Sequence, residues 1–127
     1  MSGLAARFFG SAVAYAILGM TLGLVIGMTN DHTQMPTHAH ILVVGWVSFA
    51  IYGVFYHLVP RAAESRLALA HFWLAQASFL VLIGALFAIF RGHDGAEPFA
   101  AAASVGLLAS TVLFGVIAFP RLAGSGM

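Results

Sequence analysis

Cysteine and lysine are absent from the 127 residues, and charged side chains make up only 7% of them. The lack of cysteine excludes disulfides, thiolate metal sites, iron–sulfur clusters, covalently attached c-type heme and a cysteine nucleophile. A soluble domain of this size carries about a quarter charged residues. This chain has too few charges to keep a solvated surface, so composition alone predicts an integral membrane protein.

Two further function classes find no support. The net charge is only +1 and no basic patch is found, so nucleic-acid binding is not expected. A hydrolase is not expected either, since no carboxylate pair, nucleophile elbow or zinc-protease motif occurs. The chain does carry six histidines. Imidazole is therefore the strong metal ligand that remains for spans without Asp, Glu or Lys.

Four hydrophobic runs divide the chain. Each is roughly 20 residues or a little longer, which is the length that crosses a hydrocarbon core of about 30 Å. None alternates polar and apolar residues as a membrane β-barrel strand does. Connections of about 7 to 10 residues make neighbouring helices antiparallel. We therefore expect a single all-α domain over residues 1–127, an antiparallel four-helix bundle with spans at about 8–28, 38–58, 67–90 and 99–119.

The distribution of arginine predicts the orientation of these spans. Four arginines fall on one side of the membrane and only Arg91 falls on the other; the four are Arg7, Arg61, Arg66 and Arg121. The positive-inside rule then places both termini in the cytoplasm. The first run is too long for a signal-peptide core and lacks a convincing cleavage site, so we expect it to remain as a helix. The expected location is the bacterial inner membrane, with the first and third loops in the periplasm.

Two histidines mark the outer start of the second run, in the segment Met35-Pro36-Thr37-His38-Ala39-His40. Pro36 suits the first turn of a helix. At about 100° per residue, His38 and His40 point to nearly opposite faces, so they do not share one ion unless the helix starts later. The face of His38 also carries Gly45 and then aromatic residues. Such a face suits a flat ring, because the glycine gives room and the imidazole gives an iron ligand; its aromatic members are Phe49, Tyr52 and Tyr56.

The first run has glycines at four-residue spacing, Gly19, Gly23 and Gly27, at about the depth of His38. Small residues on one face allow close helix–helix packing. The same face also offers a smooth groove against which a porphyrin can lie. These two interpretations are not exclusive.

The remaining histidines fall elsewhere. His57 and His71 lie toward the cytoplasmic side, and an ionisable group in a span is a candidate functional residue. At 1.5 Å per residue, His38 and His57 are about 28 Å apart along the helix axis. A heme with two histidine ligands can instead be held by His57 with His71, or by His38 with a histidine of a second subunit. His32 and His93 are expected to be solvated loop residues.

Each of these histidines has a simpler interpretation. A neutral imidazole that hydrogen-bonds a backbone carbonyl accounts for His38, His40 or His71 without any ligand, although burying a polar group in lipid is costly. His57 lies at the end of a predicted helix, where it can act as an interfacial cap next to Arg61.

The second run resembles a known family. Its residues Thr37-His38-Ala39-His40, Gly45-Trp46 and Tyr56-His57-Leu58-Val59-Pro60-Arg61 are similar to the second transmembrane helix of the catalytic subunit of heme-copper oxidases and nitric oxide reductases. The resemblance covers about 25 residues. It implies that His38 ligates a low-spin heme b at the outer side. The later helices that supply the second heme ligand, the copper ligands and the active-site metal ligands have no counterpart here, so neither reductase activity is expected from this chain alone.

Three function hypotheses follow. The first is a b-type heme protein for electron transfer or for heme or gas sensing, which forms a homo-oligomer and exchanges electrons with a quinol or respiratory partner. Its candidate ligands are His38, His71, His40 and His57, lined by Gly45 and Gly23, with tuning by Thr37, Ser48, Tyr52 and Gln76. The second is copper handling by an outer His/Met cluster of Met28, His32, Met35, His38 and His40. The third is an accessory or assembly subunit of a respiratory complex.

Overall fold

The computed structural model describes residues 1–122, and each regular element in that range is helical. Four helical segments are long and apolar enough to cross a membrane: Gly3–Thr29, Met35–Leu58, Arg66–Ile89 and Asp94–Leu122. The all-helical class is thereby confirmed for these residues, as is the presence of four helices long and apolar enough to span a membrane. All four segments begin before the hydrophobic runs that predict them, because the interfacial turns of a spanning helix need not be apolar.

Helix α1 (Gly3–Thr29) ends where Asn30 takes a left-handed φ of 56°. The Asn30 N–H donates to the carbonyl of Ile26 at 3.0 Å, which closes the last turn. In the loop that follows, the Asp31 carboxylate accepts hydrogen bonds from the hydroxyl and the amide of Thr33, at 2.8 and 3.1 Å. These two hydrogen bonds hold the pKa of Asp31 below its usual value.

The second span is built from three segments: α2 (Met35–His40), the π-helix η1 (Ile41–Ser48) and α3 (Phe49–Leu58). Pro36 lies in the first turn of α2, as its fixed φ favours. The hydrogen bonds of a π-helix run to the fifth residue, so η1 changes the rotational phase between α2 and α3. The Ser48 hydroxyl follows the same spacing and donates to the carbonyl of Val43 at 3.1 Å.

The third and fourth spans form the second half of the chain. A short helix, α4 (Pro60–Ala63), leads to α5 (Arg66–Ile89), which is capped by Ser65. The Ser65 hydroxyl accepts the N–H of Ala68 at 3.1 Å. A 3₁₀ turn, η2 (Asp94–Ala96), leads to α6 (Glu97–Leu122). Pro120 lies in the last turn of α6, where it interrupts little of the helix.

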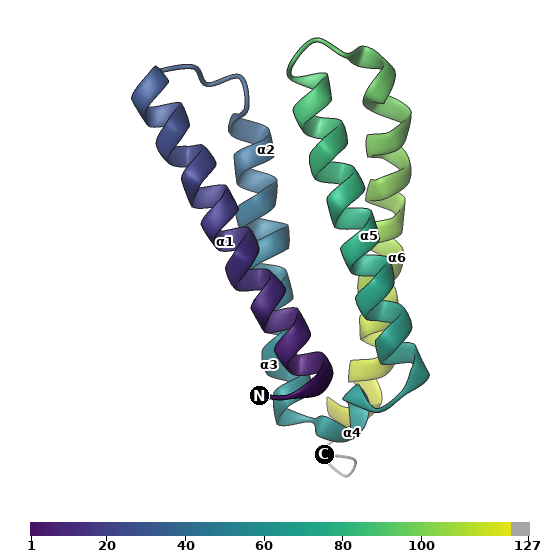
Figure 1. The fold of residues 1–127 in the computed structure, drawn as a ribbon. Helices are drawn as coiled ribbons and strands as arrows, with labels where there is room; N and C mark the ends of the chain where they lie inside the picture. The colour runs from purple at the N-terminus through teal and green to yellow at the C-terminus, as the bar shows by residue number, and fades with distance from the viewer. Residues whose placement is uncertain (123–127) are drawn as a thin grey trace.

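The long helices pair in chain order. Helix α1 packs along η1 and α3, and α5 packs along α6, while contacts between the two pairs are sparser. Figure 1 shows the chain turning back at each connection, so the N-terminus, α4 and the end of α6 share one end of the molecule. We call this the terminal end, and we call the opposite end, with the connections 30–34 and 90–93, the loop end.

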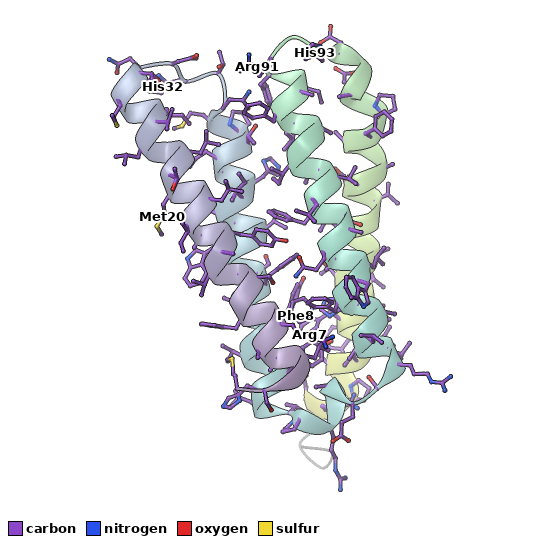
Figure 2. All side chains as sticks on the ribbon, viewed as in Figure 1. Arg7, Phe8, Met20, His32, Arg91 and His93 are labelled. Carbon is purple, nitrogen blue, oxygen red and sulfur yellow. The ribbon has the colours of Figure 1, made fainter. Side chains whose placement is uncertain are left out.

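An aromatic core fills the space between the pairs toward the terminal end. Phe8 is fully buried and its ring lies 5.7 Å from Phe49 and 4.9 Å from Phe72, between centroids. Figure 2 shows Phe8 pointing inward from α1. Edge-to-face contacts of this kind add about 0.5–1.5 kcal/mol to the area that each ring buries. The core therefore joins the two helix pairs at this end.

One polar link crosses between the pairs near mid-span. The side-chain oxygen of Gln76 on α5 accepts the hydroxyl of Tyr15, and its Nε2 donates to the Ser11 hydroxyl at 2.8 Å. Both partners lie on α1. Hydrogen bonds between spanning helices hold them together in an apolar surrounding.

The outer surface of all four long helices is apolar. Large side chains exposed on it include Ile17, Ile51, Leu80 and Val112. Such a surface is unsuited to water and matches the hydrocarbon region of a bilayer.

Candidate functional site

His38 is the histidine that joins two helices near the loop end. Its ring is half-buried, and its Nδ1 lies 2.8 Å from the carbonyl oxygen of Gly19 on α1. The ring lies directly over Gly23. A Cβ atom on Gly23 would meet the Cε1 of His38 at 2.6 Å, so the imidazole occupies the space that this glycine leaves open.

The glycine face of α1 is therefore used for packing. Gly19 meets Ile41 and Leu42 in the same way, while nothing lies within 4 Å of a Cβ on Gly27. The packing interpretation of this face holds for Gly19 and Gly23. The porphyrin interpretation of the same face stays a prediction, and Gly27 is the one of the three glycines that no other side chain covers.

His40 and His32 differ from His38 in being exposed and bonded only locally. The Nδ1 of His40 lies 2.7 Å from the carbonyl of Pro36 within its own helix. The Nδ1 of His32 lies 3.1 Å from the carbonyl of Asn30 in the first loop. His32 and His93 both lie at the loop end, where Figure 2 labels them, and their placement in loops is as predicted.

His71 is the most enclosed histidine. It is 0% exposed, and its Nδ1 lies 2.9 Å from the hydroxyl of Tyr56. Four aromatic rings surround it, with centroid distances between 4.5 and 5.9 Å; they belong to Phe8, Tyr52, Tyr56 and Phe114. Its Nε2 is buried without a hydrogen-bond partner.

His57 does not join His71 in this arrangement. Its side chain is exposed in the last turn of α3, next to a surface hollow lined by Pro60 and Glu64. The Tyr56 side chain, one residue earlier, takes the position beside His71. The proposed pairing of His57 with His71 thus requires a different arrangement from the one seen here.

The candidate ligands are dispersed. Among residues 1–122, no three His, Asp or Glu side chains come together in a way that could hold a metal ion. Met28 and Met35 of the proposed copper cluster are 76% and 45% exposed at the loop end.

Gly45 and the aromatic residues after it do not line an open surface beside His38, because other side chains cover them. A Cβ on Gly45 would meet the Phe79 ring at 2.5 Å and the Tyr15 Cβ at 2.9 Å, so these side chains fill its space. Phe49, Tyr52 and Tyr56 are buried in the aromatic core. The π-helix lies between His38 and these rings and changes the residue count per turn, which the count from His38 at 100° per residue did not include.

The proposed tuning residues are engaged with other groups. Thr37 is buried and donates to the side-chain oxygen of Gln34 at 2.7 Å. The hydroxyl of Tyr52 pairs with that of Thr111 at 3.3 Å. Ser48 and Gln76 make the hydrogen bonds described above. None of the four is bonded to a candidate histidine.

Sequence reasoning missed the Tyr56–His71 pair and the π-helix. The spans place both residues toward the same end, so the depth of the pair was available from the sequence. The sequence did not reveal how each helix is rotated about its axis, and that rotation decides which side chains meet.

No protein-family model, curated protein or solved structure matches this chain. The fold itself defines a class, namely a helical membrane protein with four spans. Within that class, the chain is distinguished by a histidine that bonds a neighbouring helix and by another enclosed among aromatic rings.

Proposed function

We propose that this chain is a b-type heme protein of the bacterial inner membrane in which His38 is an iron ligand. The observation that carries the proposal is the hydrogen bond from His38 on α2 to the Gly19 carbonyl on α1. When heme is bound, it supplies electron transfer or gas binding. The chain supplies the ligand and an apolar surrounding.

The hydrogen bond selects one form of the imidazole. A backbone carbonyl only accepts, so Nδ1 of His38 carries the hydrogen. In the neutral ring, Nε2 then has a free lone pair, which is the form that binds iron. Metal-ligating histidines commonly donate their other ring N–H to a carbonyl in this way.

Gly19 and Gly23 support this role from α1. Gly23 lets the imidazole lie against the helix, and the carbonyl of Gly19 fixes the direction of the ring. Both features belong to the backbone of α1, so the orientation of the His38 ring does not depend on a flexible side chain of α1. His40 lacks this support because it bonds only its own helix.

A second histidine ligand for the heme iron would come from a second copy of the chain. His57 and His71 lie toward the terminal end, and His40 lies on another face of α2. A homo-oligomer that pairs His38 with a histidine of the partner agrees with the apolar outer surface.

We further propose an antiparallel bundle with the terminal end in the cytoplasm. Four arginines belong to that end and Arg91 belongs to the other; the four are Arg7, Arg61, Arg66 and Arg121.

The absorption spectrum tests the proposal. Protein purified in detergent from cells supplied with heme should show a Soret band and α and β bands that sharpen on reduction. His38→Ala should lose or shift these bands, because it removes the ligand. His93→Ala is the matched control, since His93 is an exposed loop histidine, and it should leave the spectrum unchanged.

Two results would overturn the proposal. One is colourless wild-type protein, and the other is an unchanged spectrum for His38→Ala. Metal analysis of the colourless protein would then test the copper hypothesis, for which the exposed Met28 and Met35 remain available.

A further inference from the structure

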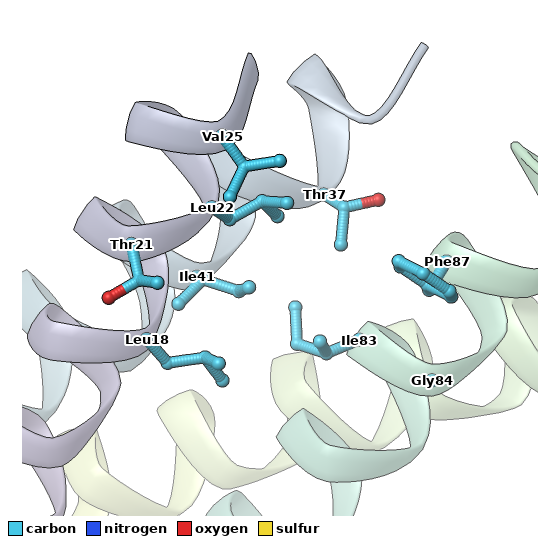
Figure 3. A pocket seen from close by; sticks show the side chains of 9 residues that line it. All are labelled: Leu18, Thr21, Leu22, Val25, Thr37, Ile41, Ile83, Gly84 and Phe87. Atoms are coloured by element: carbon cyan, nitrogen blue, oxygen red, sulfur yellow. The ribbon is translucent and has the colours of Figure 1, made fainter. Parts of the chain in front are cut away.

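A groove separates the two helix pairs at the loop end, opposite in position to the aromatic core. It has a volume of about 430 Å³, which falls in the range of about 300–1,000 Å³ typical of small-molecule sites. Figure 3 shows side chains from α1 and the second span on one side and from α5 on the other. The lining comprises Leu18, Thr21, Leu22, Val25, Thr37, Ile41, Ile83, Gly84 and Phe87.

The side chains that line the groove offer no free hydrogen-bond donor to an occupant. The hydroxyl of Thr21 donates to the carbonyl of Ile17 at 2.7 Å, and the hydroxyl of Thr37 donates to Gln34. The other lining side chains are hydrocarbon groups, and Gly84 has no side chain. A heme or a quinone head would find no ligand or donor here, whereas a hydrocarbon chain needs neither.

The groove is bridged at its loop end. Nε2 of Gln34 donates to the carbonyl of Phe87 at 3.1 Å, which connects the loop before α2 to the last turns of α5. The lining residues all belong to the spanning segments. An occupant therefore enters sideways, from the hydrocarbon region of the bilayer.

A cation lies at the rim. The guanidinium carbon of Arg91 is 5.7 Å from the centroid of the Phe87 ring, and Phe87 lines the groove. The Asp31 carboxylate is near enough for the charge of Arg91 to contribute to its lowered pKa, but its hydrogen bonds come from Thr33 and not from Arg91. A lipid whose chain fills the groove thus finds a positive charge at the level of its phosphate.

We propose that the groove between α1 and α5 binds an acyl chain of an anionic phospholipid, whose phosphate lies at Arg91. The lipid completes the packing between the helix pairs at the loop end, as the aromatic rings do at the terminal end. This inference does not rest on heme binding.

Gly84 provides the sharpest test. Nothing lies within 4 Å of a Cβ at this position, so the side chain of Gly84→Leu starts in open space beside the groove. Gly10→Leu is the matched control, because Gly10 is equally open but lies on α1 away from the groove. Native mass spectrometry of protein reconstituted in phosphatidylglycerol and phosphatidylethanolamine should show one retained phosphatidylglycerol per protomer for the wild type and for Gly10→Leu, and its loss for Gly84→Leu.

A second measurement follows the lipid directly and does not depend on filling the groove with a side chain. Phosphatidylglycerol spin-labelled near the end of its chain should show a motionally restricted component of one lipid per protomer, and Arg91→Gln should weaken its preference over phosphatidylethanolamine. The proposal is overturned if the wild type retains no phospholipid, if Gly84→Leu retains it, or if the retained mass is a quinone or a second copy of the chain.

Discussion

Gly23 and Gly27 lie one turn apart on α1, yet only Gly23 is covered by another side chain. Gly23→Ala should push the imidazole of His38 away, because the new Cβ would meet the ring at 2.6 Å. Crowding of this kind costs about 1–3 kcal/mol. We expect a shifted Soret band and weaker heme retention, measured by absorption during dialysis. Gly27→Ala should behave as wild type, and equal spectra for all three proteins would contradict the proposed role of Gly23.

The buried pair of Tyr56 and His71 predicts a change in the free energy of unfolding that does not depend on heme. Tyr56→Phe leaves both ring nitrogens of His71 buried without a partner, which should destabilise the protein by about 1–3 kcal/mol. The double variant Tyr56→Phe/His71→Phe removes both polar groups and should recover much of this loss. Unfolding in mixed micelles provides the measurement. If the double variant loses as much stability as the two single variants together, the two residues are not coupled.

At the scale of the helices, Gln76 connects α5 to α1 through two hydrogen bonds. Hydrogen bonds between membrane helices average about 0.6 kcal/mol and reach about 1.7 kcal/mol. Gln76→Leu should therefore lower the free energy of unfolding by about 1 kcal/mol. Ser104→Ala is the control, since that hydroxyl bonds only its own helix. If both variants unfold alike, the link between the helices contributes no stability.

The sequence predicted the helices better than it predicted their contacts. Length and hydropathy fix where a span begins and ends to within a few residues, because the bilayer sets that length. Pro36 and the polar stretch before it likewise indicated the start of the second span. The π-helix after His40 gave no such signal, and it changes the number of residues per turn between His38 and Tyr52. A pattern read at 100° per residue fails wherever the helix changes its period.

For the whole molecule, we expect heme and assembly to be linked. If a histidine of a second copy supplies the other axial ligand, heme-loaded protein should be an oligomer in detergent, and His38→Ala should shift toward the monomer. Light scattering of the protein–detergent complex measures this change. The same mass for both proteins would argue against a heme shared between copies.

The pairing of helices in chain order has a consequence for biogenesis. Helix α1 packs on the second span and α5 packs on α6. We therefore expect each half to bury its own face as soon as it leaves the insertion machinery. The two halves can enter the bilayer one after the other as finished hairpins. The links between Gln76 and α1, and between Gln34 and α5, then form last, within the plane of the membrane. A chain split in the connection after α3 should accordingly reassemble from two separately expressed halves.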